Sequence, residues 1–364
     1  MQEALDAADR IQQRLSSPVM VQGSEICVSA SVGVAATDEL IGEGAELMRN
    51  ADIAMYSAKT DGKARYKLFE ASMHSTVVER TALITDLRHA LERDQMEVCF
   101  QPIVELASLE ATGFEALVRW RHPERGTIDP VEFINLAEQT GLIVAIGDFV
   151  LAEACRRLVE WDGANIGSEH LTVSVNVSGR QLAARDLVDT VERVLTTTGL
   201  DPSRLTLELT ESVLLDDVDT STEQLQALKE LGVRLAIDDF GTGYSSLSYL
   251  RCLPVDFLKI DRSFVESLDG THGGADLVRA IIDLGQRLQL TTIAEGIETP
   301  EQAGFLTGAG CRLAQGFYFC RPLSPPQVRD YLRSPSRRLR PALPAIGAPL
   351  MLGGADTPDI AAAV

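Results

Sequence analysis

From Met96 onward, short apolar runs alternate with helical patterns, and this alternation restricts the possible folds more than any other feature of the sequence. Eight runs have the length and composition of buried strands: Met96–Leu106, Gly113–Trp120, Leu171–Val177, Leu205–Leu209, Leu235–Ile237, Phe257–Ile260, Thr291–Ala294 and Gly316–Phe319. Eight strands in this alternation predict a β/α barrel. The first two runs, joined by a short loop around residues 105–111, look like a hairpin, which departs from a regular parallel barrel.

Polar residues mark the ends of these predicted strands. In a barrel the strand ends converge on one face, so we expect the polar side chains to form one site. They are Glu115 and Arg119 on the second strand, Asn176 on the third, Glu208 and Glu211 on the fourth, Asp238 and Asp239 on the fifth, Lys259 and Asp261 on the sixth, Glu295 and Glu298 on the seventh, and Gln315 at the start of the eighth.

The fifth strand ends in two adjacent acids, Asp238 and Asp239, followed by a loop in which Gly241 and Gly243 permit tight turns. Neighbouring residues on a strand point to opposite sides, so a pair buried mid-strand would leave one carboxylate desolvated. At the C-terminal end of a strand both acids can turn toward a common ion. The alternative is a capping aspartate followed by a glycine turn.

The converging carboxylates create an electrostatic problem. Two carboxylates about 4 Å apart repel by about 4 kcal/mol at an effective dielectric constant near 20, and Lys259 and Arg119 are the obvious cations among the motifs. Either some acids take up protons or cations bind. Oxygen ligands without Cys or His favour Mg²⁺ or Mn²⁺. A salt-bridge network would require matching basic residues, and a calcium site usually draws its ligands from one loop.

Two hard ions held by shared carboxylates, with a lysine nearby, suit the hydrolysis of a phosphodiester. A guanidinium group can bind a phosphate through two hydrogen bonds, so Arg119 is a candidate to clamp one. A two-metal barrel that acts on carboxylate substrates remains an alternative, but it would usually place a second base opposite the lysine. The residue pattern by itself does not identify the substrate.

Composition narrows the class of protein. The chain has 364 residues, 45% of them hydrophobic, and a formal net charge of −20. This charge argues against binding polymeric nucleic acid or an anionic membrane, but allows a small phosphorylated molecule if metal ions locally reverse the field. Without a long apolar run or a signal-like N-terminus, we expect a cytoplasmic protein with no membrane contact. The 6 scattered cysteines suggest neither a zinc site nor disulfides.

The sequence divides into four parts. Residues 1–69 show helix and strand patterns but are few for an α/β domain. Residues 70–94 predict a linker helix with Leu83, Leu87 and Leu91 on one stripe. Residues 95–332 form the predicted barrel. Residues 333–364 are rich in Pro, Gly and Ala, and we expect them to be disordered.

Eight short motifs occur in the predicted barrel: Gln101-Pro-Ile-Val, Glu115-Ala-Leu-Val-Arg119, Asn176-Val-Ser, Glu208-Leu-Thr-Glu211, Asp238-Asp-Phe-Gly-Thr-Gly243, Lys259-Ile-Asp261, Ala294-Glu-Gly-Ile-Glu298 and Gln315-Gly. Over about residues 80–332 they closely resemble, in order and spacing, the EAL family of cyclic di-GMP phosphodiesterases. The resemblance implies a TIM-like barrel with an antiparallel first strand, and cleavage of cyclic di-GMP to linear pGpG. Phe100 stands where a tyrosine is common in the family.

The resemblance also implies a role for each motif residue. One ion would be held by Glu115, Asn176, Glu208 and Asp238, and the second by Asp238, Asp239 and Glu295. Lys259 would position a water or help to deprotonate it, and Glu211 would order the loop of Gly241 and Gly243. The substrate site would be lined by Gln101, Leu117, Arg119 and Gln315, with Asp261 and Glu298 in supporting roles.

The N-terminal part carries Ser31-Val-Gly-Val, then Ala51-Asp-Ile-Ala-Met-Tyr-Ser-Ala-Lys59, and Gly62. These residues resemble the C-terminal half of a GGDEF (diguanylate cyclase) domain. The half that would carry the signature motif and the metal-binding acid is absent, so we expect a partial domain without cyclase activity. Lys59 matches a lysine that contacts nucleotide phosphates in that family.

Two expectations concern the whole chain. Many EAL domains are degenerate and act as cyclic di-GMP receptors or protein-interaction modules, and these usually lose a ligand acid or the loop motif. This chain keeps the ligand acids and the loop motif, so we expect an active enzyme, with a catalytically silent receptor or protein-interaction module as the alternative.

The resemblance also implies a homodimer formed through the barrel, because the loop after Asp239 often contributes to dimerisation in the family.

Overall fold

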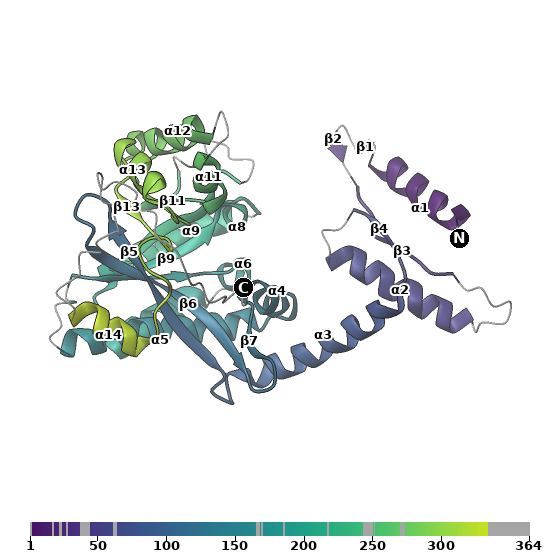
Figure 1. Cartoon of the computed structure of the whole chain (residues 1–364), viewed down its shortest axis with the longest axis horizontal. Helices are drawn as coiled ribbons and strands as arrows, with labels where there is room; N and C mark the ends of the chain where they lie inside the picture. Colours follow the sequence, from purple (N-terminus) through teal and green to yellow (C-terminus); the bar gives the residue numbers. More distant parts are fainter. Residues whose placement is uncertain are drawn as a thin grey trace, which may run out of the picture. The chain divides into compact units, whose positions relative to one another are not determined.

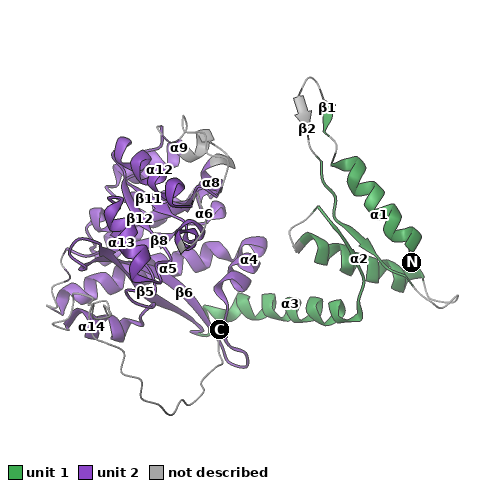
Figure 2. Ribbon diagram, turned by 45° about the horizontal axis from the view of Figure 1, so that its top comes forward, with its two compact units in different colours: residues 1–93 green, residues 94–364 purple. Residues whose placement is uncertain are grey.

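A computed structural model of the chain (Figure 1) describes residues 2–16, 18–21, 24–26, 28–36, 44–60, 64–164, 168, 170–184, 186–216, 218–242, 250, 252–269 and 274–333. The chain forms two compact units, Met1–Arg93 and Asp94–Val364 (Figure 2). Residues 334–364 of the predicted tail lie outside the described residues, as does Gly243 of the predicted loop.

The first unit combines short strands with three helices. Its elements are α1 (Gln2–Leu15), β1 (Val19–Val21), β2 (Ser24–Ile26), β3 (Val32–Val34), α2 (Gly44–Thr60), β4 (Tyr66–Leu68) and α3 (Ala71–Ala90). β1 pairs with β2 in antiparallel orientation, and β3 pairs with β4 in parallel orientation. Both α1 and α2 contact β3, and the small side chains of Ala8, Ala54 and Ala58 are buried, which allows close packing of the helices.

The second unit contains a closed barrel. Its eight strands are β5 (Met96–Glu105), β6 (Ala111–His122), β8 (Thr172–Asn176), β9 (Leu205–Thr210), β10 (Arg234–Phe240), β11 (Phe257–Ile260), β12 (Thr291–Ala294) and β13 (Leu313–Ala314). Neighbours pair in the order β5, β13, β12, β11, β10, β9, β8, β6, and β6 returns to β5. β5 is antiparallel to both of its neighbours, whereas the other pairs in the ring are parallel. The predicted barrel with an antiparallel first strand is confirmed.

Helices surround this barrel (Figure 1). The longer ones are α4 (Pro130–Thr140), α5 (Ile143–Gly163), α7 (Leu187–Thr198), α9 (Val218–Glu230), α12 (Gly274–Arg287), α13 (Pro300–Gly308) and α14 (Pro325–Arg333). The shorter ones are α6 (Gly179–Ala183), α8 (Glu211–Asp216), α11 (Arg262–Glu266), η1 (Pro202–Arg204) and η2 (Ser267–Asp269), and a short strand, β7 (Gly126–Ile128), pairs with β6. Between barrel and helices, Trp161 of α5 packs edge-on against Phe100 of β5 with ring centroids 4.9 Å apart.

The eighth strand differs from the prediction. The strand is Leu313–Ala314, whereas residues 316–319 form a turn. Gly316 lies so close to the chain that a Cβ there would be 2.1 Å from the Ile297 carbonyl oxygen, and the apolar Phe317 is 45% exposed. The apolar run was therefore mistaken for a strand, and Gln315 follows the eighth strand instead of opening it.

None of the helices in the described part of the chain is long and apolar enough to cross a membrane.

Candidate active site

Lys259 of β11 lies at the centre of the barrel end where the parallel strands terminate, which we call the acidic end. Its side chain is 1% exposed. The Nζ atom lies 2.5 Å from Glu208 Oε2, 2.6 Å from Glu295 Oε1, 3.1 Å from Asp238 Oδ1 and 3.9 Å from Glu115 Oε1. These carboxylates come from β6, β9, β10 and the residue after β12, so the structure brings acids from four strands to one cation.

One ammonium group does not neutralise this cluster. Burial raises the pKa of Glu208 to about 8; Lys259 opposes this shift, and the negative Glu115 and Asp238 add to it. Burial likewise raises the pKa of Glu295 well above its usual range. Burial disfavours the charged form of Lys259, but the surrounding carboxylates outweigh it and hold the pKa of Lys259 well above its usual value. Without metal ions, Lys259 therefore keeps its proton, and the carboxyl groups of Glu208 and Glu295 take up protons more readily than free carboxyl groups do.

A β-bulge turns Asp238 and Asp239 to the same side. The register of β10 against β11 shifts between Ile237 and Phe240, and Asp239 has a positive φ of 53°. Asp238, Asp239 and Glu295 consequently offer oxygen atoms that all lie within 4.8 Å of one another. Such a backbone conformation costs about 1 to 3 kcal/mol for a residue with a Cβ. Burial, together with the nearby charges of Asp238 and Asp261, raises the pKa of Asp239 to about 6.

Amide side chains hold the carboxylate of Glu115 in place. Asn176 Nδ2 donates to Glu115 Oε1 at 2.7 Å, and Gln315 Nε2 donates to Glu115 Oε2 at 2.6 Å. Gln315 Nε2 also lies 2.9 Å from Gln101 Oε1, and Gln101 Nε2 donates to the Cys320 carbonyl oxygen at 3.1 Å. Both oxygens of Glu115 therefore have fixed directions.

Glu211 fixes the backbone that follows the two aspartates. Its Oε2 accepts a hydrogen bond from the Gly241 N–H at 2.9 Å. Gly241 has a φ of 98°, and a Cβ there would lie 2.9 Å from Phe264 Cε2, so this position favours glycine in both conformation and space. Glu211 thus anchors the start of the predicted loop.

The rim of the acidic end contains a cation that sequence reasoning missed. Arg262, at the start of α11, donates from Nη2 to Glu298 Oε1 at 2.9 Å. It directly follows Asp261, which caps α11 by accepting from the Ser263 N–H at 3.0 Å and also hydrogen-bonds Asp239. The sequence could have indicated Arg262, because it lies just after β11, and the neighbouring Asp261 is predicted from its position at the end of the same strand.

Two depressions adjoin the acidic cluster. A cleft of about 220 Å³ is lined by Glu115 and Glu295 together with Gln101, Leu117, Arg262, Glu298, Gln315 and Phe317. Beside it, a mostly apolar pocket of about 330 Å³ is lined by Leu117 and Arg119 of β6, Asn176, and residues of α4 and α5. Arg119 Nη1 donates to the Val118 carbonyl oxygen at 2.9 Å, so Arg119 is near the cluster without being an ion-pair partner of its described acids.

The donors at the acidic end fit a hard divalent cation. Glu208 Oε1 is buried and has no hydrogen-bond partner among the described residues, which is unfavourable unless a cation or proton satisfies it. Asp238, Asp239 and Glu295 are the acids of the described chain that lie close enough together to share one ion. The acids expected at the other ion, Glu115 and Glu208, lie near Lys259, as Asp238 and Glu295 also do.

Comparisons with known proteins agree with this geometry. The EAL domain family matches residues 84–322, and the family described as "Diguanylate cyclase, GGDEF domain" matches residues 1–65. The chain is 45% identical over 330 residues to the bifunctional diguanylate cyclase/cyclic di-GMP phosphodiesterase MucR of Pseudomonas aeruginosa, with 90% of this chain and 47% of MucR covered. It is 39% identical over 323 residues to the cyclic di-GMP phosphodiesterase PdeR of Escherichia coli, with 88% and 48% covered.

Solved structures are similar as well. The PaMucR phosphodiesterase in complex with c-di-GMP superposes with a TM-score of 0.66 and 46% identity, over 68% of this chain and 99% of that one. The EAL enzyme Bd1971 in a cGMP-bound form gives a TM-score of 0.68 and 32% identity, over 71% of each chain. The chain spans less than half the length of MucR and PdeR. With its barrel, its motifs and the match over residues 84–322, the chain belongs to the EAL-domain family.

Proposed function

We propose that the barrel hydrolyses one phosphodiester bond of cyclic di-GMP to give linear pGpG, with two Mg²⁺ or Mn²⁺ ions as cofactors. The observation that carries this proposal is the cluster of carboxylates around Lys259, whose negative charge exceeds the single positive charge of the lysine. The cluster includes Asp238 and Glu295, which together with Asp239 are close enough to share one ion. The names of MucR and PdeR support cyclic di-GMP as the substrate.

Two overlapping sets of residues in this chain would bind the two ions. Asp238, Asp239 and Glu295 would hold one ion, and Glu115, Asn176, Glu208 and Asp238 the other. The chemistry that such ions supply is activation of a water molecule and stabilisation of negative charge on the phosphate. Lys259, which lies among these carboxylates, would position a water molecule or help to deprotonate it.

Other residues would bind and orient the substrate. Arg119 would clamp a phosphate, and Leu117 would provide apolar contact between the cleft and the adjacent pocket. Gln101 and Gln315 border the cleft and are already linked by a hydrogen bond of 2.9 Å. The supporting residues act indirectly: Asp261 through Asp239, and Glu298 through Arg262.

The proposal also covers the first unit of the chain and the oligomeric state of the protein. We infer that the partial GGDEF unit has no cyclase activity and that the protein works as a homodimer through the barrel in the cytoplasm. Light scattering of the purified chain would measure its mass in solution, and a monomer that still hydrolyses cyclic di-GMP would contradict the dimer requirement.

The test of the proposed function is a timed incubation of the purified chain with cyclic di-GMP, in Mg²⁺, Mn²⁺ or EDTA, with chromatographic separation of the nucleotides. We expect pGpG to appear only with a metal ion. Tight binding of cyclic di-GMP without turnover in either metal would instead assign the chain to the receptors. Equal turnover in EDTA would contradict the metal-ion mechanism.

A further inference from the structure

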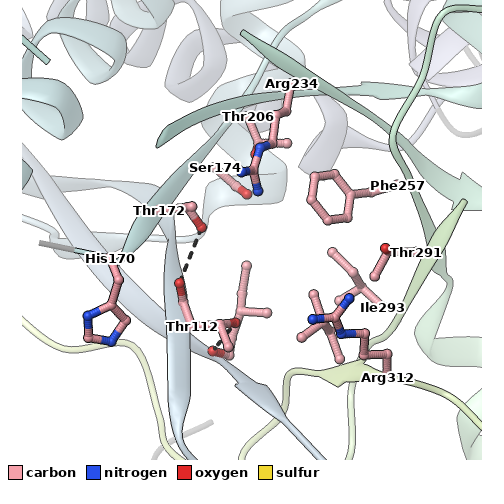
Figure 3. Close-up of a pocket in the computed structure, with 12 residues that line it drawn as sticks. Thr112, His170, Thr172, Ser174, Thr206, Arg234, Phe257, Thr291, Ile293 and Arg312 are labelled. Atoms are coloured by element: carbon pink, nitrogen blue, oxygen red, sulfur yellow. Dashed lines mark hydrogen bonds between the residues drawn. The ribbon is translucent and has the colours of Figure 1, made fainter. Parts of the chain in front are cut away.

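The opposite end of the barrel contains a second pocket. It has a volume of about 240 Å³ and is lined largely by the residues at which the strands begin (Figure 3). Thr172, Arg234, Phe257, Thr291 and Leu313 are the first residues of β8, β10, β11, β12 and β13. The pocket therefore lies at the N-terminal end of the parallel strands, away from the acidic end.

The charge in this pocket is opposite to that of the whole chain. Arg234 and Arg312 reach it from two sides (Figure 3), and its lining contains no Asp or Glu. Arg312 has one acidic neighbour, Glu105, at 3.7 Å between Nε and Oε1, and its side chain is 68% exposed. Arg234 forms no ion pair with a described residue. The chain has a formal net charge of −20, yet this pocket is lined by two arginines and by no acidic residue, so it is suited to bind an anion.

Two hydroxyl groups deep in the pocket have no hydrogen bond to a residue that the structure describes. Ser174 and Thr206 are each 3% exposed, and neither side chain has a hydrogen bond to a described residue. They lie side by side on β8 and β9, and each precedes a side chain of the acidic end, Asn176 and Glu208, by two residues. Because alternate strand residues share a face, both hydroxyls point into the barrel. Both residues line the cavity, so their hydroxyls are open to it and can donate hydrogen bonds to a ligand there.

The remaining walls limit the size and kind of ligand. Ile103, Ile293 and Leu313 form an apolar cluster on one side, with Phe257 packed against it. Thr112 and Thr172 already donate to backbone carbonyls, at 3.3 and 3.4 Å (Figure 3). A volume of about 240 Å³ exceeds the about 30 Å³ share of one water but falls below the about 300 Å³ at which pockets for drug-sized ligands begin. This size suits a small ion or a small ester.

We propose that this pocket binds phosphate, either as the free ion or as the monoester group of a small molecule. Arg234 and Arg312 supply the positive charge, and the hydroxyls of Ser174, Thr206 and Thr291 supply hydrogen-bond donors around the anion. This site is independent of cyclic di-GMP hydrolysis, since it shares no lining residue with the cleft at the acidic end.

Flow dialysis of the full chain with labelled inorganic phosphate in EDTA tests the site directly, with glycerol 3-phosphate as competitor. We expect one saturable site, weakened about tenfold or more in Arg234→Gln, because a charged hydrogen-bond donor is lost. The isosteric Thr206→Val should also weaken binding. Arg287→Ala is the matched control, because Arg287 is exposed on α12 and lines neither pocket. Arg119→Ala should leave phosphate binding unchanged, which separates this site from the acidic end.

The two sources of phosphate are distinguished by competition. Displacement by glycerol 3-phosphate at concentrations below those of inorganic phosphate indicates a small phosphorylated molecule, and weaker displacement indicates the free ion. Either result supports the site if Arg234→Gln weakens it. Absence of saturable binding up to about 10 mM, a standard free energy weaker than about −3 kcal/mol, would overturn the proposal. So would equal binding by wild type and Arg234→Gln, with unfolding curves showing that both are folded.

Discussion

On β8 and β9, Asn176 and Glu208 face the acidic end, whereas Ser174 and Thr206, two residues earlier on the same strands, line the pocket at the other end. The acidic end packs carboxylates around Lys259, where ion pairs and hydrogen bonds offset part of the cost of burying them. At the other end, the hydroxyls of Ser174 and Thr206 face a cavity and have no hydrogen bond to a described residue. A single step of two residues along β8 and β9 therefore separates two different polar layers inside the barrel, the hydroxyl layer of Ser174 and Thr206 and the charged layer at the acidic end.

The largest effect should come from removing one charge at the acidic end. Glu208→Gln should lower the rate of pGpG formation by more than about 10²-fold, because even groups that only support a metal ligand typically contribute 10–100-fold. Glu105→Gln, on β5 near the other end, is the matched control and should keep wild-type turnover. Chromatography of the nucleotides measures both rates, and full activity of Glu208→Gln at ordinary Mg²⁺ would contradict the two-ion assignment.

Replacing the central cation should affect stability more than replacing an exposed one. Lys259→Met leaves buried carboxylates without their partner, so the free energy of unfolding in EDTA at pH 8 should fall by about 3–5 kcal/mol. Lys229→Met, which removes a half-buried pair with Asp256 at 2.8 Å, should cost about 1 kcal/mol or less. Denaturant titrations give both values. Equal losses would show that the cluster around Lys259 is no more costly to break than a surface pair.

The acidic end should also make the metal-free protein sensitive to pH. The pKa values of Glu208 and Asp239 are raised in the folded chain, to about 8 and about 6. The folded state therefore binds more protons than the unfolded state between about pH 4 and 8, and stability falls as the pH rises through this window. We expect a decrease on the order of a few kcal/mol in EDTA, and a smaller one with Mg²⁺. A flat profile in EDTA would contradict the raised pKa values.

The smallest effect should come from the unpaired hydroxyls. In phosphate-free buffer, Thr206→Val should change the free energy of unfolding by less than about 1 kcal/mol, because the hydroxyl that it removes faces the cavity and has no hydrogen bond to a described residue. Thr292→Val is the matched control: Thr292 is 4% exposed, but its hydroxyl contacts Cys311 Sγ at 3.6 Å. Losing that contact should destabilise the chain. A large loss of stability in Thr206→Val would mean that its hydroxyl has a protein partner.

The barrel was predictable because its signals are local. Apolar runs, helix periods and the short link between β5 and β6 can each be read from a few neighbouring residues. The residue types at the acidic end could be chosen in the same way, since each lies on a strand or just after one. Arg262 was missed although it obeys the same rule, and residues 316–319 were mistaken for a strand because an apolar run does not show how closely Gly316 approaches Ile297.

Other features could not be read from the sequence because they depend on contacts between distant segments. The bulge that turns Asp239 toward Asp238 arises from the register of β10 against β11. Ser174, Thr206 and Thr291 are ordinary strand residues, and only the closed barrel shows that their hydroxyls face a cavity shared with Arg234.

The reversed direction of β5 decides where the chain enters the barrel. Glu105, the last residue of β5, pairs with Leu313 at the start of β13, whereas Gln101 pairs with Glu115 and Met96 with Trp120, farther along β6. The chain that leaves the first unit at Arg93 therefore joins the barrel on the side of Glu115 and Lys259. A shift at the start of β5 would therefore act on the strand that carries Gln101, a residue that borders the cleft at the acidic end.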